Sequence, residues 1–321
     1  MKSLSVMIGL ALVGNVVGDD GWDRFRGANG TGVVGGEGVP VTFDERDYAW
    51  NTELPGIGHS SPVAWGERLF LTCLDADGAA RSAVGISLAD GKVLWKTDFK
   101  FAEHSLHRFN NYASTTPCVD ADRVYLSWET GDRREVVALS HDGREMWKKD
   151  VGFYEENHGT GASPILVDGL LIVPNDHAGE GGSILALDPV SGATKWSYRR
   201  APEKTSFATP VVYRPERGAA QLLVAGTPYG VTGLDIKTGK KLWESGEPFD
   251  QRTVASPVII GDVVFVSSGQ GGGGKKAFAA KIPATKRSKP VEAEWVETKA
   301  LPYVPTPVVK DGLIYLWTDS G

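Results

Sequence analysis

The chain is 321 residues long, enough for two ordinary domains or for one large all-β or repeat domain. Forty glycines and eighteen prolines, with no long helical pattern, favour many short strands joined by turns. A formal charge of −6 gives no basic footprint and argues against nucleic acid as a partner. Two cysteines, Cys73 and Cys118, are too few for a disulfide framework or a four-ligand zinc site. They either pair with each other after export or stay apart as buried thiols.

The first eighteen residues have the pattern of a signal peptide. Lys2 is followed by a short apolar run over 4–13 and by small residues at 16–18. The run is too short to span a bilayer. We therefore predict a cleaved signal peptide over 1–18, no transmembrane segment after its removal, and a periplasmic or secreted protein.

A glycine-rich segment follows, and it contains WDRFRGANGTG from Trp22 to Gly32. It has no hydrophobic periodicity, so we expect an N-terminal strap or loop over 19–47. After it, YAWNTEL from Tyr48 to Leu54 predicts a short strand that carries Trp50.

From there on, Ser/Thr-Pro followed by an apolar residue recurs six times. The Ser or Thr is residue 61, 116, 163, 209, 256 or 306, and successive prolines are 55, 47, 46, 47 and 50 residues apart. Most copies are followed by a β-rich run such as RLFLTC or RVYLSW. A fixed period of this size indicates a structural repeat.

A second pattern closes each repeat. An apolar residue and a polar or acidic turn lead to a glycine, and a tryptophan follows the glycine by four residues, at Leu88–Trp95, Leu139–Trp147, Leu187–Trp196 and Leu234–Trp243. The pattern is typical of a β-hairpin. Each unit of about 47 residues then contains four antiparallel strands, as in a blade of a β-propeller. Proline suits the first strand position, where no ladder donor is needed.

Blades cannot bury both faces alone, so neighbouring blades must share a core. We expect the repeat tryptophans to pack between blades, and a cofactor-stacking surface is the alternative. These tryptophans are Trp50, Trp95, Trp147, Trp196, Trp243 and Trp295.

The count of repeats is uneven. The fifth blade, Ala279 to Trp295, lacks the Asp/Gly turn and holds a Lys/Arg/Pro insertion, and the sixth reaches only its second strand. The segment that carries Trp50 precedes the first Ser/Thr-Pro pair. We expect it to form the fourth strand of the last blade and so to close the ring. We expect a propeller over 48–321 of about five and a half blades, from a C-terminally truncated chain.

The segments ALDPVSGATKW and GLDIKTGKKLW resemble the tryptophan-docking repeats of pyrroloquinoline-quinone-type propellers. WDRFRGANGTG and LPGIGHSSPV are similar to the exported bacterial members in particular. The resemblance runs from Trp22 to Gly321 and implies an all-β propeller with eight blades when complete. It indicates the fold and leaves the activity open.

The residues just ahead of each Ser/Thr-Pro should converge on one mouth of the central channel. They are polar and aromatic, with Ser60, Asn110, Tyr112, Asn157 and Phe207 beside the main candidates His59, His104, His107, Arg108, Asn111, His158, Arg252 and Tyr303. This pattern predicts a ligand or partner site. The alternative is that these loops are polar because they are wet. No histidine pair has a tight metal-ligand spacing, so we predict no metal.

The resemblance to quinone dehydrogenases implies adjacent cysteines that form a disulfide ring, and a calcium site with a catalytic aspartate. Cys73 and Cys118 lie 45 residues apart. This departure argues against pyrroloquinoline quinone with calcium, so we expect no cofactor and assign no catalytic residue. The predicted function is a non-catalytic binding or scaffold module with a protein or glycan partner. The alternatives are a quinone-dependent oxidoreductase and a polymer-degrading enzyme that uses the channel mouth.

Overall fold

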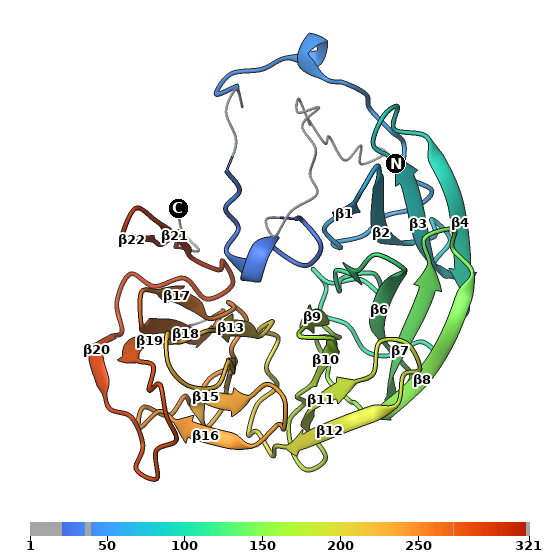
Figure 1. Ribbon diagram of the computed structural model, residues 1–321. Helices are drawn as coiled ribbons and strands as arrows, with labels where there is room; N and C mark the ends of the chain where they lie inside the picture. Colours follow the sequence, from blue (N-terminus) through green and yellow to red (C-terminus); the bar gives the residue numbers. More distant parts are fainter. Residues whose placement is uncertain (1–20, 36–39, 272, 319–321) are drawn as a thin grey trace.

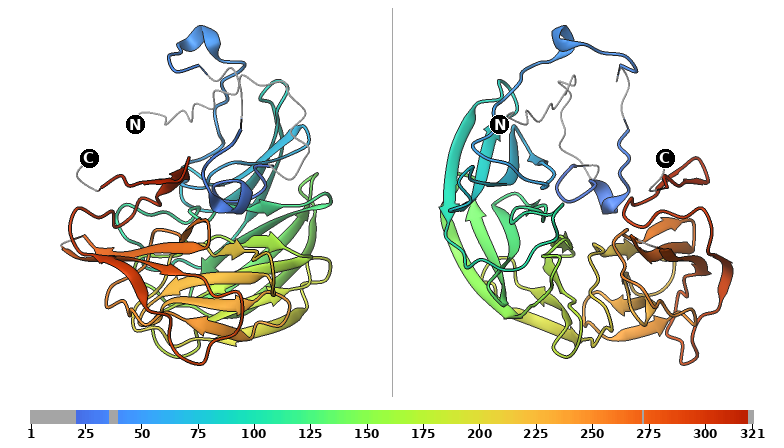
Figure 2. Two further views of the ribbon diagram at one scale, coloured as in Figure 1. Left: turned by 60° about the vertical axis from the view of Figure 1, so that its left-hand side comes forward. Right: turned by 180° about the vertical axis from the view of Figure 1, so that it is seen from behind.

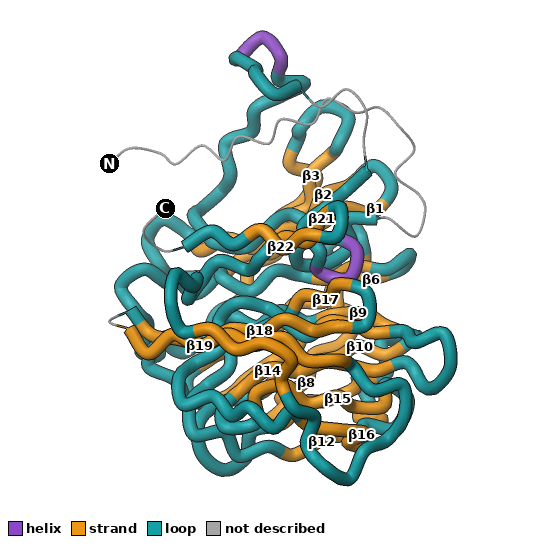
Figure 3. The backbone as a smooth tube through the Cα atoms, turned by 90° about the vertical axis from the view of Figure 1, so that its left-hand side faces the viewer, coloured by secondary structure: helices purple, strands orange, loops and turns teal. Residues whose placement is uncertain are grey.

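The computed structural model describes residues 21–35, 40–271 and 273–318. Regular structure there is almost all antiparallel β-sheet (Figure 3), apart from two short 3-10 turns, η1 (Ala28–Gly30) and η2 (Glu45–Asp47). No helix in these three ranges is long and apolar enough to cross a bilayer. The signal peptide predicted over 1–18 lies outside the described residues.

Within the described residues, five four-stranded sheets and one two-stranded sheet follow one another, and each is built from consecutive strands. The first two are β1 (Val63–Trp65), β2 (Arg68–Leu74), β3 (Arg81–Ser87) and β4 (Val93–Phe99), then β5 (Cys118–Val119), β6 (Arg123–Thr130), β7 (Arg133–Ser140) and β8 (Glu145–Phe153). The next two are β9 (Ile165–Val167), β10 (Leu170–Asn175), β11 (Ser183–Leu187) and β12 (Thr194–Arg199), then β13 (Val211–Tyr213), β14 (Gln221–Gly226), β15 (Gly230–Asp235) and β16 (Lys241–Glu244). The last two are β17 (Val258–Ile260), β18 (Val263–Gln270), β19 (Gly273–Lys281) and β20 (Ala293–Glu297), then β21 (Val308–Lys310) and β22 (Leu313–Tyr315).

Every sheet begins directly after a Ser/Thr-Pro pair, and the sheets are the predicted blades. They form an arc in which the first strand of a blade faces the middle and the fourth strand lies on the outer rim (Figure 1). The predicted all-β propeller of four-stranded units is confirmed.

The tryptophan of one blade packs on the turn between the third and fourth strands of the next. Its indole Nε1 donates to a carbonyl oxygen of that turn at 2.7 to 3.0 Å, in the pairs Trp50 to Leu88, Trp95 to His141, Trp147 to Pro189 and Trp196 to Ile236. The turn glycine lies against the indole. A Cβ on Gly239, for example, would lie 2.5 Å from the Trp196 ring, and the φ of Gly239 is +67°. Both constraints require glycine, which explains the Gly-to-Trp pattern in the sequence.

The strand predicted over Tyr48–Leu54 is not formed, and this segment belongs to no sheet. Trp50 still docks on the turn of the first blade, and the Thr52 hydroxyl donates to the Gly91 carbonyl at 2.6 Å. The segment therefore makes the side-chain contacts of a fourth strand without the backbone ladder. No described strand lies beside it to provide ladder partners, so its β-propensity alone does not make it a strand.

The fifth blade breaks the docking pattern, as its unusual sequence indicated. Trp243 is 1% exposed, and its Nε1 donates to the side-chain oxygen of Gln221 at 2.6 Å instead of to a turn. The connection 282–292 between β19 and β20 covers it, because Val291 belongs to the same apolar cluster. Trp295 is 42% exposed.

A second set of links joins the blades close to their inner strands. In every Ser/Thr-Pro pair after the first, the side-chain hydroxyl accepts a hydrogen bond from the backbone N–H of the matching residue one blade earlier. The five bonds are 3.0 to 3.1 Å long and run Ser61 to Thr116, Thr116 to Ser163, Ser163 to Thr209, Thr209 to Ser256 and Ser256 to Thr306. A hydroxyl is thus needed at each of these positions in addition to the proline.

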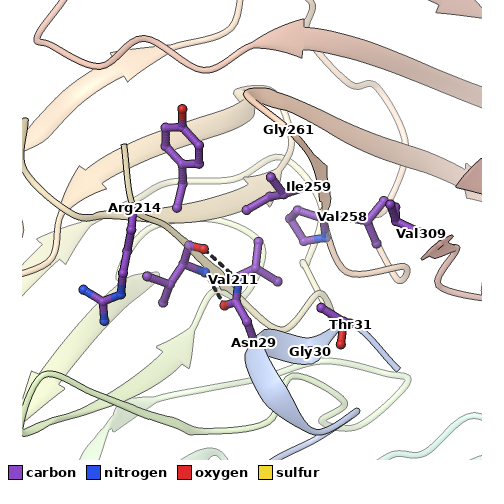
Figure 4. Close-up of a pocket in the computed structure, with 12 residues that line it drawn as sticks. Asn29, Gly30, Thr31, Val211, Arg214, Val258, Ile259, Gly261 and Val309 are labelled. Atoms are coloured by element: carbon purple, nitrogen blue, oxygen red, sulfur yellow. Dashed lines mark hydrogen bonds between the residues drawn. The ribbon is translucent and has the colours of Figure 1, made fainter. Parts of the chain in front are cut away.

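The first part of the predicted N-terminal strap, which carries η1, lies in the middle of the arc, whereas the later part with η2 stands outside it (Figure 2). Its bonds reach the inner strands of four blades, through Trp22 to Ala64, Asp23 to Val119, Arg24 to Pro210, Asn29 to Val212 and Arg26 to Pro307. The Asn29 side chain makes a pair of bonds with the Val212 backbone, at 2.7 and 2.8 Å (Figure 4). A pocket of about 310 Å³ remains between this segment and the strands β13 and β17.

Alanine at Gly239 should destabilise the protein more than alanine at Gly169. Both glycines have positive φ, +67° and +73°, so each substitution carries about 1–2 kcal/mol of backbone strain. Only Gly239 also faces an indole, whereas a Cβ on Gly169 meets nothing within 4 Å. We expect an extra loss of about 1–3 kcal/mol for Gly239→Ala, measured by urea denaturation. Equal losses for the two variants would contradict the docking role of the turn.

Candidate functional site

The connections that enter the first strands all lie on one face of the propeller. Because strands within a blade alternate in direction, the turns between second and third strands lie on that face as well. We call it the channel-mouth face. Its longest connection joins β4 to β5 over residues 100–117 and contains four of the eight main predicted site residues.

Two of the predicted histidines meet on this face. The rings of His107 and His158 stack with their centroids 5.5 Å apart and their planes 8° from parallel. Phe109 lies edge-on to His107 at 5.4 Å, and Phe207 lies edge-on to His158 at 6.2 Å. We call these four side chains the aromatic patch. They come from three successive connections between blades, and Phe109 is 70% exposed.

The patch is held by polar contacts from its neighbours. The Asn110 amide donates to the His158 carbonyl at 2.6 Å, which ties the connection before β5 to the connection before β9. The Glu156 carboxylate contacts His158 Nδ1 at 2.7 Å and accepts a hydrogen bond from the Thr205 hydroxyl. An exposed aromatic surface is therefore presented on an ordered support.

His104 turns away from this patch into the protein. Its Nε2 lies 3.4 Å from the Glu129 carboxylate, and the two side chains are 7% and 2% exposed. The Arg81 guanidinium donates to the Glu129 backbone carbonyl. It also lies over the rings of Phe101 and Trp128 at 4.6 and 4.4 Å. Glu129 and Arg81 come from neighbouring blades, so this cluster exists only where two blades meet.

Burial shifts the pKa values of this pair in opposite directions. Desolvation raises the pKa of Glu129 to about 8, against the opposing charges of Arg134 and Arg81. Desolvation also lowers the pKa of His104 to about 4, and the charge of Arg81 acts in the same sense. At neutral pH both groups are therefore mostly uncharged, and Glu129 carries a proton.

Buried arginines recur at the next two blade junctions. Arg134 donates to the Ala162 carbonyl at 2.7 Å and lies over the Tyr154 ring. Arg200 lies over Tyr229 and 3.1 Å from the carboxylate of Asp176. The sequence analysis missed these residues. One pattern in the sequence could have indicated two of them, because arginine stands at the start of the third strand in each of the first two blades.

The other predicted residues are dispersed. His59 is exposed, and its backbone N–H donates to the Ala113 carbonyl, while Asn111 accepts from the Ala113 N–H. Arg108 folds over the ring of Phe109 at 4.5 Å. Arg252 and Tyr303 both lie next to Gly269 and form a second group. The structure thus brings together only some of the predicted site.

The described residues show neither the paired cysteines nor the carboxylate cluster that the resemblance to quinone dehydrogenases implies. Calcium takes six to eight oxygen ligands, and no group of three His, Cys, Asp or Glu side chains in the described ranges could hold a metal ion. Cys73 and Cys118 are free, buried and placed in separate apolar clusters.

Comparison with known proteins agrees with the fold. The family model described as outer membrane protein assembly factor BamB matches residues 80–321. The solved structure of BamB from Moraxella catarrhalis is 17% identical with a TM-score of 0.56, covering 84% of this chain and 72% of that one. Quinohemoprotein alcohol dehydrogenase from Comamonas testosteroni is 12% identical with a TM-score of 0.54, covering 90% and 68%. A europium-containing methanol dehydrogenase is 13% identical with a TM-score of 0.52, covering 78% and 60%.

No curated protein matches the chain. At these identities the solved structures show the fold alone. The expected resemblance to pyrroloquinoline-quinone-type propellers is confirmed by the family match.

The pKa of Glu129 gives a pH test. The folded pKa of about 8 lies above the 4.5 of an unperturbed glutamate, so the unfolded chain loses this proton first as pH rises. The contribution of Glu129 to the free energy of unfolding should therefore fall between about pH 5 and 8 and level off above that range. The lowered pKa of His104 acts in the opposite sense below about pH 6.5, so the difference between wild type and variant isolates the effect of Glu129. Glu129→Gln removes this dependence, so the variant should gain up to a few kcal/mol relative to wild type across the window. Urea denaturation at several pH values measures it, and parallel curves would contradict the buried protonated state.

Proposed function

We propose that this chain, which belongs to the outer membrane protein assembly factor BamB family, is an exported propeller. We propose that it holds a protein partner at its channel-mouth face. The family description is that of an assembly factor, which favours a binding or scaffold role over catalysis. Export rests on the signal-peptide pattern over 1–18, and the protein would then act in the periplasm or outside the cell.

The observation that carries this proposal is the exposed and braced aromatic patch. Aromatic side chains are enriched among the residues that dominate binding energy at interfaces. A support that is already ordered lowers the entropy cost of binding. The patch meets both conditions, with Phe109 largely exposed and His158 held by Asn110 and Glu156.

A second candidate, a polymer-degrading enzyme at the channel mouth, is favoured by one observation. Glu129 holds a proton at neutral pH beside an uncharged His104, and such a pair can exchange a proton with a substrate. A general acid must reach its substrate, however, and both side chains are nearly fully covered. The binding role is therefore the stronger of the two.

Site-specific photocrosslinking tests the partner site. A photoreactive residue at position 109 should give a discrete protein adduct in cells that express the full chain. His158→Ala should lower the yield of that adduct about fivefold or more, as expected for a contact worth at least 1 kcal/mol.

Position 94 provides the control for this experiment. Leu94 is 49% exposed on the rim strand β4 and should give no such adduct. Equal adducts from both positions would show nonspecific contact and contradict the proposal. Polymer cleavage that is lost in Glu129→Gln would support the enzyme instead.

A further inference from the structure

The connection 282–292 is the clearest departure from the repeat. In four blades a short Asp/Gly turn joins the third and fourth strands, whereas here eleven residues, IPATKRSKPVE, connect β19 to β20. They contain Lys286, Arg287 and Lys289 in a chain whose formal charge is −6. The three bases are exposed. A run of charge is often only a solvated surface, so the local structure decides its meaning.

The backbone of this connection is fixed to the rim strand of the preceding blade. The Arg287 N–H donates to the Leu242 carbonyl at 2.8 Å, and the Val291 N–H donates to the Glu244 carbonyl at 2.9 Å. The Gln221 amide donates to the Pro283 carbonyl at 2.6 Å. In Figure 1 β16 and β20 both lie on the outer rim, so the connection bridges two blades there. Its bases are therefore presented from an ordered segment.

A pocket of about 500 Å³ opens beside these bases. Its walls include Lys281, Arg287 and Lys289 together with Tyr213. This volume lies in the range of pockets that take small organic ligands.

The local charge balance leaves cations unpaired. Lys281 pairs with Asp262 at 3.0 Å, and Glu292 is the other carboxylate of the pocket wall. Among the described residues no ion pair is found for Lys286, Arg287 or Lys289. The hairpin of the preceding blade carries a further base, Lys240, two residues before Leu242. The Leu242 carbonyl is the one that accepts the hydrogen bond from the Arg287 N–H.

We propose that this pocket binds the phosphate group of a ligand of sugar-phosphate size, either free or as the headgroup of a lipid. The planar guanidinium of Arg287 suits bidentate contact with phosphate oxygens, and Lys289 adds a flexible point charge. Tyr213 provides a ring wall for the part of the ligand that carries the phosphate.

The site is separate from the channel-mouth face. Connections between third and fourth strands leave a blade on the edge opposite to the connections that enter first strands. The proposal therefore stands or falls independently of the partner site at the aromatic patch.

The test compares two double variants of the full chain with matched charge loss. Arg287→Gln with Lys289→Gln removes two pocket bases, and Arg144→Gln with Lys149→Gln removes two bases on the second blade. Binding of glucose 1-phosphate is measured by calorimetry, with glucose as the uncharged control. We expect binding by wild type and by the second-blade variant, and a loss of about tenfold or more in the pocket variant.

Vesicles distinguish the two sources of phosphate. Binding to phosphatidylglycerol vesicles but not to phosphatidylcholine vesicles, lost in the pocket variant, identifies a headgroup. Binding of glucose 1-phosphate alone identifies a free ligand. The proposal would be overturned if neither glucose 1-phosphate nor the vesicles bind, or if both double variants lose binding equally. It would also be overturned if polyglutamate binds as tightly as glucose 1-phosphate. Urea denaturation confirms that each variant is folded.

Discussion

The contact between a tryptophan and the glycine turn of the next blade is the interaction on which this architecture depends. A four-stranded blade has two apolar faces, and neither can be covered within the blade. The indole covers the next turn and donates to its carbonyl, so one residue gives both burial and direction to the outer part of each junction up to the fourth blade. The Ser/Thr hydroxyl bonds fix the inner part. A blade that is held to its neighbour near the inner strand and again at the rim has little freedom to tilt or slide.

Much of the fold was visible in the sequence because this contact constrains residue types tightly. The glycine must have positive φ and must lack a Cβ, and the tryptophan must follow at a set distance across a hairpin. Predictions from the sequence were wrong where the local structure depends on neighbours that are remote in the chain. Tyr48–Leu54 has the composition of a strand, yet strand formation requires a ladder partner, which composition does not reveal. The hydroxyl links were missed because Ser or Thr before proline has ordinary local explanations.

The candidate site was predicted in part for the same reason. Counting along the repeat places His107 and His158 ahead of successive Ser/Thr-Pro pairs, although not at equivalent positions, and in the structure their rings stack. The same counting cannot tell which side chain turns inward, and His104 does so because Glu129 and Arg81 line a junction between blades. Buried charges at a junction draw their partners from two repeats. Their significance appears only when the repeats are set side by side.

The central position of the N-terminal segment changes how such a protein should fold. Stacked repeats interact mainly with nearest neighbours, so they can lose order from either end, one unit at a time. Here Trp22 to Asn29 bonds to the inner strands of the first, second, fourth and sixth blades. Those bonds connect the first two blades with the fourth and the sixth, which are not their neighbours, and draw them into one cooperative transition. The residues from Trp22 to Asn29 leave the ribosome early, yet their contact with Pro307 can form only after the sixth blade has been synthesised.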